Sequence, residues 1–300
     1  MKKHYFLIFV IALLLRLGVL YELRHVNPIP NGTDMLTYYN QAIDFTHGQW
    51  PTPEAFFYHP LVPLIILLSF KFFGISTLAP QLLNCIISAL SCPILAVVGV
   101  KLFDRKTGLV AGWLLAFYQA GVFYSTVILD VPFTTLALVV SLWAVSNPNL
   151  RISLITGLIL SLGILGRGTL LISAISIIGW LIIKRQYLAG VTMSLTLILC
   201  LMPIVARNAA YGAPAITTNG PINLWIGNNP DANGTYNIHK GGEAYAITMA
   251  IAESDGKWLN HIMEYIRTQP LDWLQLTLQK AVMFFFLPDG FMPHNVFGSC

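Results

Sequence analysis

The chain has 300 residues, of which 56% are hydrophobic and only 10% are charged, and its formal net charge is +4. A soluble domain carries about 25% charged residues. This composition therefore excludes an ordinary cytosolic enzyme, a nucleic-acid-binding domain, a disordered chain and a secreted disulfide scaffold. Apolar runs long enough to cross a bilayer recur along the sequence. They predict an all-α polytopic membrane protein with no nucleic acid among its partners.

The first apolar run covers residues 5–21 and follows Met1-Lys2-Lys3. No small-residue cleavage site comes after it, so we predict an uncleaved first helix rather than a signal peptide. The later apolar runs cover residues 61–73, 81–100, 108–124, 127–146, 152–166, 168–183, 188–206 and 271–287. A helix needs about 20 residues to span the hydrocarbon core, with about 17 as a lower limit, and the run 61–73 is too short.

Positive charge predicts the orientation of the spans. If residues 61–73 lie on the membrane surface, four connections share one side: residues 1–4, 101–107, 147–151 and 184–187. These connections hold eight lysines and arginines against one acid, Asp104, which is the pattern of cytoplasmic loops. We therefore predict one membrane module over residues 1–300, with its N-terminus inside and about eight crossings. The large extracytoplasmic segments are then 22–80 and 207–270.

Ionisable side chains gather near the predicted extracytoplasmic helix ends, where charges are costly and are candidates for function. Asp34 and Asp130 each precede a predicted helix, so each suits either a helix cap or a catalytic carboxylate. Arg167 lies in a tight turn and either snorkels to the surface or holds a lipid phosphate with its planar donors. His59 is either a contact to phosphate or metal or an ordinary interfacial residue. Arg16, inside the first helix, is predicted to snorkel.

The segment that begins at Arg207 is rich in Gly, Asn and Pro and is predicted to consist of turns. Asparagine side chains and aromatic rings commonly bind sugars, through paired hydrogen bonds and stacking. Asn219, Trp225 and Asn228 are therefore candidate sugar contacts. The alternative is a loop that is simply exposed to water.

Six short motifs follow one another along the chain: Asp34 with Tyr38 or Tyr39 and Ala42; Tyr58-His59-Pro60-Leu61; residues 102–106; Ile128-Leu129-Asp130 with Pro132-Phe133; residues 163–167; and Arg207-Asn208 through Pro230. Together, over nearly the whole chain, they resemble the GT-C superfamily of membrane glycosyltransferases. The most similar branch is the family 39-type, protein O-mannosyltransferase-like group, which includes bacterial aminoarabinose transferase and lipopolysaccharide core transferases.

The resemblance implies a GT-C-like bundle with extracytoplasmic juxtamembrane helices, in a bacterial plasma membrane, with an extracytoplasmic active site. It also implies a polyprenyl-phosphate sugar as donor and a lipid, glycan or protein as acceptor. Asp34 falls on the position of the catalytic carboxylate, and Asp130 falls on the second acidic position. His59 stands where the aminoarabinose transferase has a lysine, so it is expected to face the donor phosphate.

Two features depart from the family pattern. Met35 follows Asp34 where many members have a second acid, which weighs against a paired-carboxylate metal site. Members also usually continue well past 300 residues, which leaves open that the sequence is a C-terminally truncated piece of a longer chain.

The predicted reaction is inverting glycosyl transfer, with Asp34 as general base. Arg167, Arg207 and His59 are expected to stabilise the departing polyprenyl phosphate. Asp130 is expected either to position the acceptor or to help Asp34 bind a divalent cation, Mg²⁺ or Mn²⁺. The residues expected to contact sugar or acceptor are Tyr38, Tyr58, Asn219, Trp225 and Asn228.

Two other classes of protein remain as alternatives. A transporter or flippase of lipid-linked sugar precursors predicts charges deep within the crossings and discontinuous helices at mid-membrane. A non-catalytic assembly or sensor protein predicts no meeting of Asp34, Asp130 and Arg167.

Overall fold

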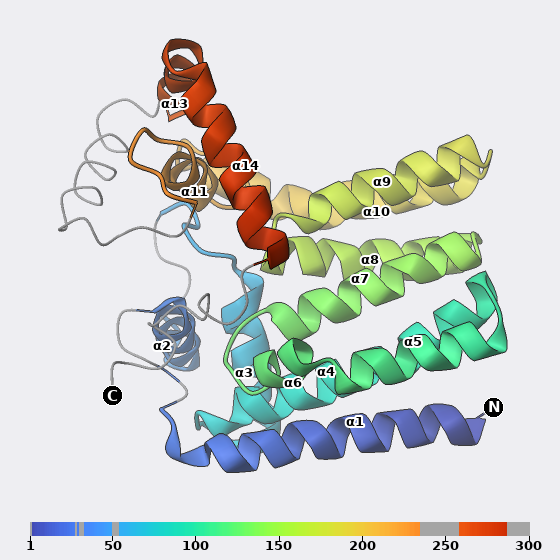
Figure 1. Ribbon diagram of the computed structural model, residues 1–300. Helices are drawn as coiled ribbons and strands as arrows, with labels where there is room; N and C mark the ends of the chain where they lie inside the picture. Colours follow the sequence, from blue (N-terminus) through green and yellow to red (C-terminus); the bar gives the residue numbers. More distant parts are fainter. Residues whose placement is uncertain (1, 28, 30–32, 50–53, 235–257, 287–300) are drawn as a thin grey trace. The chain divides into compact units, whose positions relative to one another are not determined.

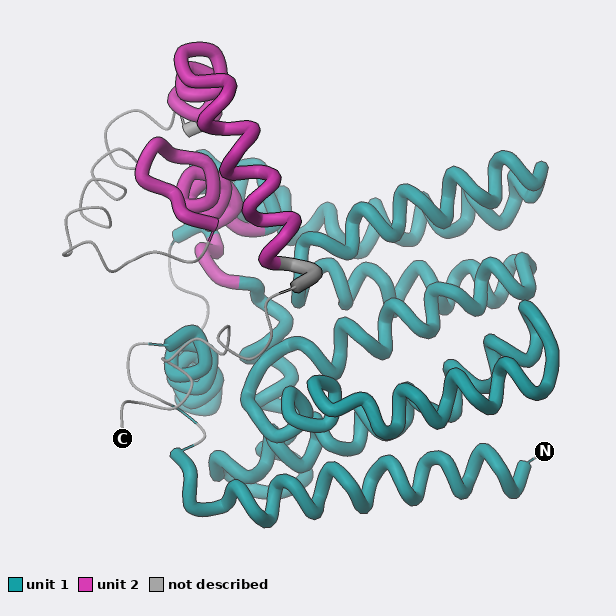
Figure 2. Tube along the Cα trace, viewed as in Figure 1, with its two compact units in different colours: residues 1–55, 59–216, 295–300 teal, residues 56–58, 217–294 magenta. Residues whose placement is uncertain are grey.

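The computed structural model describes residues 2–27, 29, 33–49, 54–234 and 258–286, and among these no residue is in a strand. The chain divides into two compact units, one of residues 1–55, 59–216 and 295–300 and the other of residues 56–58 and 217–294 (Figure 2). Three helices, Lys2–His25, Leu78–Leu102 and Tyr187–Ala209, are long and apolar enough to cross a membrane, and four more are apolar but shorter. The predicted class, an all-α polytopic membrane protein, is confirmed.

The first unit is a bundle of helices that run back and forth (Figure 1). Its α-helices are α1 (Lys2–Glu22), α2 (Asp34–Thr46), α3 (Leu61–Phe73), α4 (Leu78–Leu102), α5 (Arg105–Phe117), α6 (Gln119–Tyr124), α7 (Val131–Ser146), α8 (Leu150–Gly166), α9 (Leu170–Ile183) and α10 (Tyr187–Ala209). A short 3₁₀ turn, Leu23–His25, extends α1. A helix forms at each apolar run predicted for this part of the chain.

The second unit contains α11 (Asn219–Gly227), α13 (Trp258–Thr268) and α14 (Pro270–Phe286). Within it α11 packs against α13, and α13 packs against α14. Helix α14 covers residues 271–286 of the last predicted apolar run, 271–287, and residue 287 lies outside the described residues. The predicted segment 207–270 therefore includes helical structure as well as turns.

The connections of the bundle agree with the sidedness predicted from charge. The N-terminus and the α4–α5, α7–α8 and α9–α10 connections lie at the same end of the first unit (Figure 1). Helices α2 and α3 and the α6–α7 connection lie at the opposite end. Since α3 packs against α2, α4 and α8 at that end, the run 61–73 forms a separate short helix, as predicted.

Two predicted helices differ from the structure at their ends. The run 108–124 is interrupted at Tyr118, which adopts an extended conformation with ψ of 107° between α5 and α6. Within the run 127–146, the helix begins only at Val131. Pro132 lies in the first turn, which is where a helix favours proline. The residues before it, 125–130, form a non-helical loop, called the Asp130 loop below.

The prediction that Arg16 snorkels is wrong. Its side chain is fully buried between α1, α4 and α5. Its Nε donates to Ser88 Oγ at 2.8 Å, and its Nη1 donates to the carbonyls of Ala12 at 2.9 Å and Ala116 at 3.3 Å. Ala116 lies in the last turn of α5, where carbonyls lack intrahelical partners. The guanidinium therefore finds its acceptors inside the protein rather than at the membrane surface.

Helices α4 and α5 approach closely through small residues, as is common between membrane helices. A Cβ atom built on Gly108 would lie 2.6 Å from the carbonyl oxygen of Ala96, and one on Gly112 would lie 2.7 Å from Ala96 Cβ. Backbone atoms cannot move away as a flexible side chain can. Gly108 is thus a position where the fold requires glycine.

We predict that Gly108→Ala lowers the free energy of unfolding in detergent by about 1–3 kcal/mol, because it overpacks the α4–α5 contact. The matched control is Gly179→Ala in α9, where a Cβ meets nothing within 4 Å. That change should raise stability by about 0.5–1 kcal/mol through helix propensity. Thermal unfolding of the purified variants measures both, and a stabilised Gly108→Ala protein would contradict the close packing.

Candidate active site

The most specific polar contact of the bundle joins Asp130 to Arg167. Arg167 Nε donates to Asp130 Oδ2 at 2.7 Å, and Arg167 Nη2 donates to Oδ1 at 3.1 Å. This two-point geometry is the strong, oriented form of the arginine–carboxylate pair. The Asp130 side chain is 10% exposed and that of Arg167 is 49% exposed. The pair thus has a buried acidic side and a surface-facing basic side.

Asp130 binds Arg167 with its side chain and does not cap helix α7. It occupies the position before α7, but its side chain accepts no capping hydrogen bond. The sequence left Asp130 as either a helix cap or a catalytic carboxylate. The structure shows that it is not a helix cap. Arg167 likewise does not behave as an isolated snorkelling residue, since its Nε and Nη2 both donate to Asp130.

The turn Gly166-Arg167-Gly168 lets other segments approach the pair. A Cβ atom on Gly166 would lie 3.3 Å from Leu61 Cδ2 and 3.9 Å from Asp130 Cβ, and one on Gly168 would lie 3.7 Å from His59 Cε1. The small residues on either side of Arg167 therefore allow the chain before α3 to pack here. This brings His59 beside the pair, and its expected contact with a donor phosphate stays a prediction.

Asp34 is the first residue of α2 and shares the electrostatic environment of Asp130. The helix cap is Thr33, which makes no side-chain capping bond. The Asp34 side chain reaches the surface, yet surrounding protein removes part of its hydration and raises the pKa of its carboxyl. The negative charge of Asp130 raises this pKa further. One turn later on α2, Tyr38 is buried and lies within electrostatic reach of Arg167.

His59 is neutral at neutral pH. Burial lowers the pKa of its imidazole, the Asp130 carboxylate opposes this effect, and the Arg167 guanidinium lowers the pKa further. Its Nδ1 is buried, and among the residues that the structure describes it has no hydrogen-bond partner. His59 is therefore a neutral hydrogen-bonding group rather than a second cation.

Arg207 lies at the end of α10. Its Nη1 donates to Asn208 Oδ1 at 2.9 Å, and its guanidinium lies 5.2 Å from the centre of the Tyr211 ring. Asn208 is fully buried and donates to the carbonyls of Ala215 and Ile216. These contacts fasten the chain that leaves α10, and a role of Arg207 in binding phosphate stays a prediction.

The remaining predicted sugar contacts, Tyr58, Asn219, Trp225 and Asn228, belong to the second unit. Asn228 Oδ1 accepts from Trp273 Nε1 at 3.2 Å and from Lys280 Nζ at 3.3 Å, so it ties α11 to α14. Asn219 Oδ1 accepts from the Thr217 hydroxyl at 2.9 Å. The ring of Trp225 packs edge-on against His261, and that of Tyr58 against Phe57. Each residue thus has partners within its own unit.

A divalent cation does not fit the arrangement described. Both carboxylate oxygens of Asp130 already accept from Arg167, whose positive charge disfavours a metal at the same group. Over residues 2–27, 29, 33–49, 54–234 and 258–286, no three His, Cys, Asp or Glu side chains gather as a metal site would require. The predicted binding of Mg²⁺ or Mn²⁺ stays untested.

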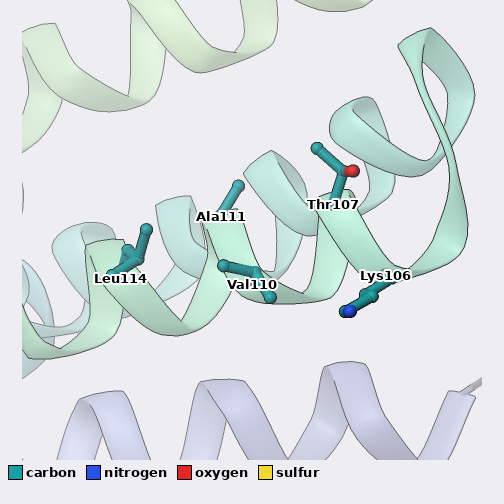
Figure 3. A pocket seen from close by; sticks show the side chains of 5 residues that line it. All are labelled: Lys106, Thr107, Val110, Ala111 and Leu114. Carbon is teal, nitrogen blue, oxygen red and sulfur yellow. The ribbon is translucent and has the colours of Figure 1, made fainter.

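A cavity of about 450 Å³ lies along α5, away from these residues (Figure 3). It is lined by Lys106, Thr107, Val110, Ala111 and Leu114. Its first lining residues belong to the first turn of α5, at the end of the bundle that carries the N-terminus (Figure 1). The candidate active site lies at the other end.

Sequence reasoning missed the residues of α4 that support the site. Gln81 and Asn84 are buried, and they donate to backbone carbonyls of the Asp130 loop. Their spacing of three residues places them on one face of α4. Buried amides within an otherwise apolar helix were the available signal, because such groups must find partners inside the protein.

An all-helical bundle with long apolar helices defines the class of polytopic integral membrane proteins. Residues 53–209 match the dolichyl-phosphate-mannose-protein mannosyltransferase family. The match covers more than half of the chain, and the protein therefore belongs to this family and is a membrane glycosyltransferase of the GT-C type. Comparisons with curated proteins and with solved structures give no match. His59, Asp130 and Arg167 fall within the matched residues, and Asp34 precedes them.

We predict that Asp130 and Arg167 stabilise each other by about 1 kcal/mol, between the values of exposed and buried ion pairs. A double-mutant cycle of Asp130→Asn and Arg167→Gln, measured by denaturation in mixed micelles, gives this coupling. The control cycle replaces Arg167→Gln with Arg151→Gln, an exposed arginine in the first turn of α8. Equal coupling in both cycles would show that the pair is not specific.

Proposed function

We propose that the protein transfers a sugar from a polyprenyl-phosphate donor to a hydroxyl group of a lipid, glycan or protein acceptor. The reaction takes place on the extracytoplasmic side of a bacterial plasma membrane. The observation that carries this proposal is the meeting of Asp34, Asp130 and Arg167 at the end of the bundle opposite the N-terminus. A carboxylate with a raised pKa beside an oriented arginine suits base-assisted attack on a lipid-linked phosphate.

In the proposed reaction, the acceptor oxygen forms a bond to the anomeric carbon while the bond from that carbon to the phosphate oxygen breaks. Attack from the face opposite the phosphate inverts the configuration. Asp34 accepts the proton of the acceptor hydroxyl, and polyprenyl phosphate leaves with the electron pair of the broken bond. The raised pKa of Asp34 supports this role, because a base is most effective when its pKa is near the working pH.

Arg167 is proposed to bind the donor phosphate and to stabilise the charge that develops on it. Asp130 engages two of the five N–H groups that an arginine carries. The half-exposed side chain can turn its other donors toward an anion. Because Asp130 already holds the guanidinium in place, little reorganisation is needed during the reaction. Asp130 thus has a positioning role that does not depend on a metal.

His59 is proposed to donate a hydrogen bond to the donor phosphate. Its lowered pKa makes it a neutral donor and not a cation. Arg207 is proposed as a further cation for the phosphate. The proposed contacts to sugar or acceptor are Tyr38, Tyr58, Asn219, Trp225 and Asn228.

The buried Arg16 is the type of charge that the transporter alternative predicts, but its surroundings favour a structural role. Its donors bind a hydroxyl and two backbone carbonyls that join α1, α4 and α5. Such a set of contacts holds the helices together. A transporter would move the lipid-linked sugar without breaking its phosphate bond, so the assay below separates the two functions.

The first test is transfer of radiolabelled mannose from polyprenyl-phosphate mannose in membranes that contain the protein. Release of polyprenyl phosphate with label in a new product supports a transferase, and movement of intact donor supports a flippase. Mass analysis of glycolipids and glycoproteins from cells with and without the gene then identifies the sugar and the acceptor.

We predict that Asp34→Asn lowers the transfer rate by about 10²–10⁴, the usual contribution of a general base. The matched control is Asp44→Asn, an exposed aspartate on the same helix, which should keep the wild-type rate. Both variants should be present in the membrane at wild-type level. Near-normal transfer by Asp34→Asn would reject the base assignment.

We also predict that transfer falls as the pH drops through the pKa of Asp34, because only the carboxylate accepts the proton. Since this pKa is raised, the fall should begin above the value of about 4 expected for an ordinary aspartate. In Asp130→Asn, the residual transfer should fall at a lower pH than in the wild type. The charge of Asp130 then no longer raises the pKa of Asp34, while desolvation still does. A fall at the same pH in both proteins would contradict the coupling of the two aspartates.

A further inference from the structure

The Asp130 loop, residues 125–130, is held from one side by two amide side chains of α4. Gln81 Nε2 donates to the carbonyl of Thr126 at 2.6 Å. Asn84 Nδ2 donates to the carbonyls of Val127 at 2.8 Å and Leu129 at 3.2 Å. An NH₂ group has two hydrogens, and the two carbonyls that Asn84 contacts lie on either side of Ile128.

The contacts to Thr126 and Val127 are buried and the contact to Leu129 is partly buried, so water does not replace them easily. Gln81 is 8% exposed and Asn84 is 4% exposed, while Thr126 and Ile128 in the loop are also buried. A buried carbonyl outside a helix needs a donor from elsewhere in the protein. The two amides supply donors that the non-helical backbone of the loop lacks.

The contact to Leu129 bears directly on the site. The Leu129 carbonyl belongs to the peptide unit that links Leu129 to Asp130. Since the peptide unit is planar, holding its oxygen restricts where the backbone of Asp130 lies. The Asp130 carboxylate then receives the two hydrogen bonds from Arg167. A chain of contacts therefore runs from Asn84 through the loop to the guanidinium.

We propose that Gln81 and Asn84 are positioning residues of the active site: by holding the Asp130 loop, they fix where Asp130 presents its carboxylate to Arg167. This inference rests on the proposed function, in which Arg167 meets the donor phosphate. Neither amide needs to touch substrate. A misplacement of about 1 Å in a reacting group can cost about 10²-fold in rate, so loss of the amides should affect transfer.

The first measurement is hydrogen exchange of the Asp130 loop in the purified full-length protein. Asn84→Leu and Gln81→Met keep side-chain volume and remove the donors. Exchange at residues 125–130 should become at least about tenfold faster in Asn84→Leu and should also rise in Gln81→Met. The control is Ser91→Ala, a buried polar residue of α4 whose hydroxyl bonds only within its own helix. Unchanged loop exchange in both amide variants would overturn the inference.

The second measurement separates positioning from general stability. Asn84→Leu should lower the kcat of mannose transfer from polyprenyl-phosphate mannose by about tenfold, with a smaller effect on the donor KM. The same change in an Asp130→Asn background should have little further effect, because the carboxylate to be positioned is absent. Equal fold-losses in both backgrounds would overturn the positioning role. If Asn84→Leu does not fold, the same comparison of kcat with and without Asp130→Asn is made with Gln81→Met. This variant removes a single hydrogen bond.

The outcomes distinguish this inference from the proposed function. Wild-type transfer by Asp130→Asn would contradict the part of the proposed function given to Asp130, and the positioning role with it. Loss of transfer in Asp130→Asn together with full activity and fast loop exchange in Asn84→Leu would overturn the inference alone. Exchange needs no substrate, so the hold on the loop is tested whether or not mannose is the sugar transferred.

Discussion

Buried backbone carbonyls outside helices must find hydrogen-bond donors within the protein, and the site of this glycosyltransferase depends on how they do so. Between α6 and α7 the chain leaves the helical conformation for residues 125–130. Gln81 and Asn84 on α4 donate to the carbonyls that lack helical partners there. The loop can then end at Asp130 in a defined position, from which its carboxylate pairs with Arg167. Regular helices alone would not have presented an acid at this place.

The charged groups of the site change one another's pKa values and orientation. Asp130 orients Arg167, and its negative charge also raises the pKa of Asp34, which burial has already raised. Burial lowers the pKa of His59, Asp130 opposes this effect, and Arg167 lowers the pKa further. Burial and the ion pair together give Asp34 a raised pKa and His59 a lowered one, and they leave the Arg167 side chain half-exposed. These properties support the proposed transfer from a phosphate donor.

The need of buried polar groups for hydrogen-bond partners also explains the position of Arg16, which lies beside the interruption between α5 and α6. A fully buried guanidinium in a membrane helix is costly unless its donors are satisfied. Here α5 ends shortly before Tyr118, and Arg16 donates to the carbonyl of Ala116 as well as to Ser88. Close packing at Gly108 and Gly112 brings α5 against α4. Both irregular segments of the bundle are thus supported by polar side chains from helices α1 and α4.

The amino-acid sequence by itself determined where the helices form and which connections share one end of the bundle, because apolar length and the placement of lysines and arginines are local properties of the chain. It also identified Asp34, Asp130, His59 and Arg167 as candidate site residues. Only the tertiary structure decided that Asp130 binds Arg167, 37 residues away, and that α4 holds the Asp130 loop from a distance of 45 residues. Such contacts depend on which helix faces pack together. That packing is set by close fits between small residues, which no single apolar run reveals.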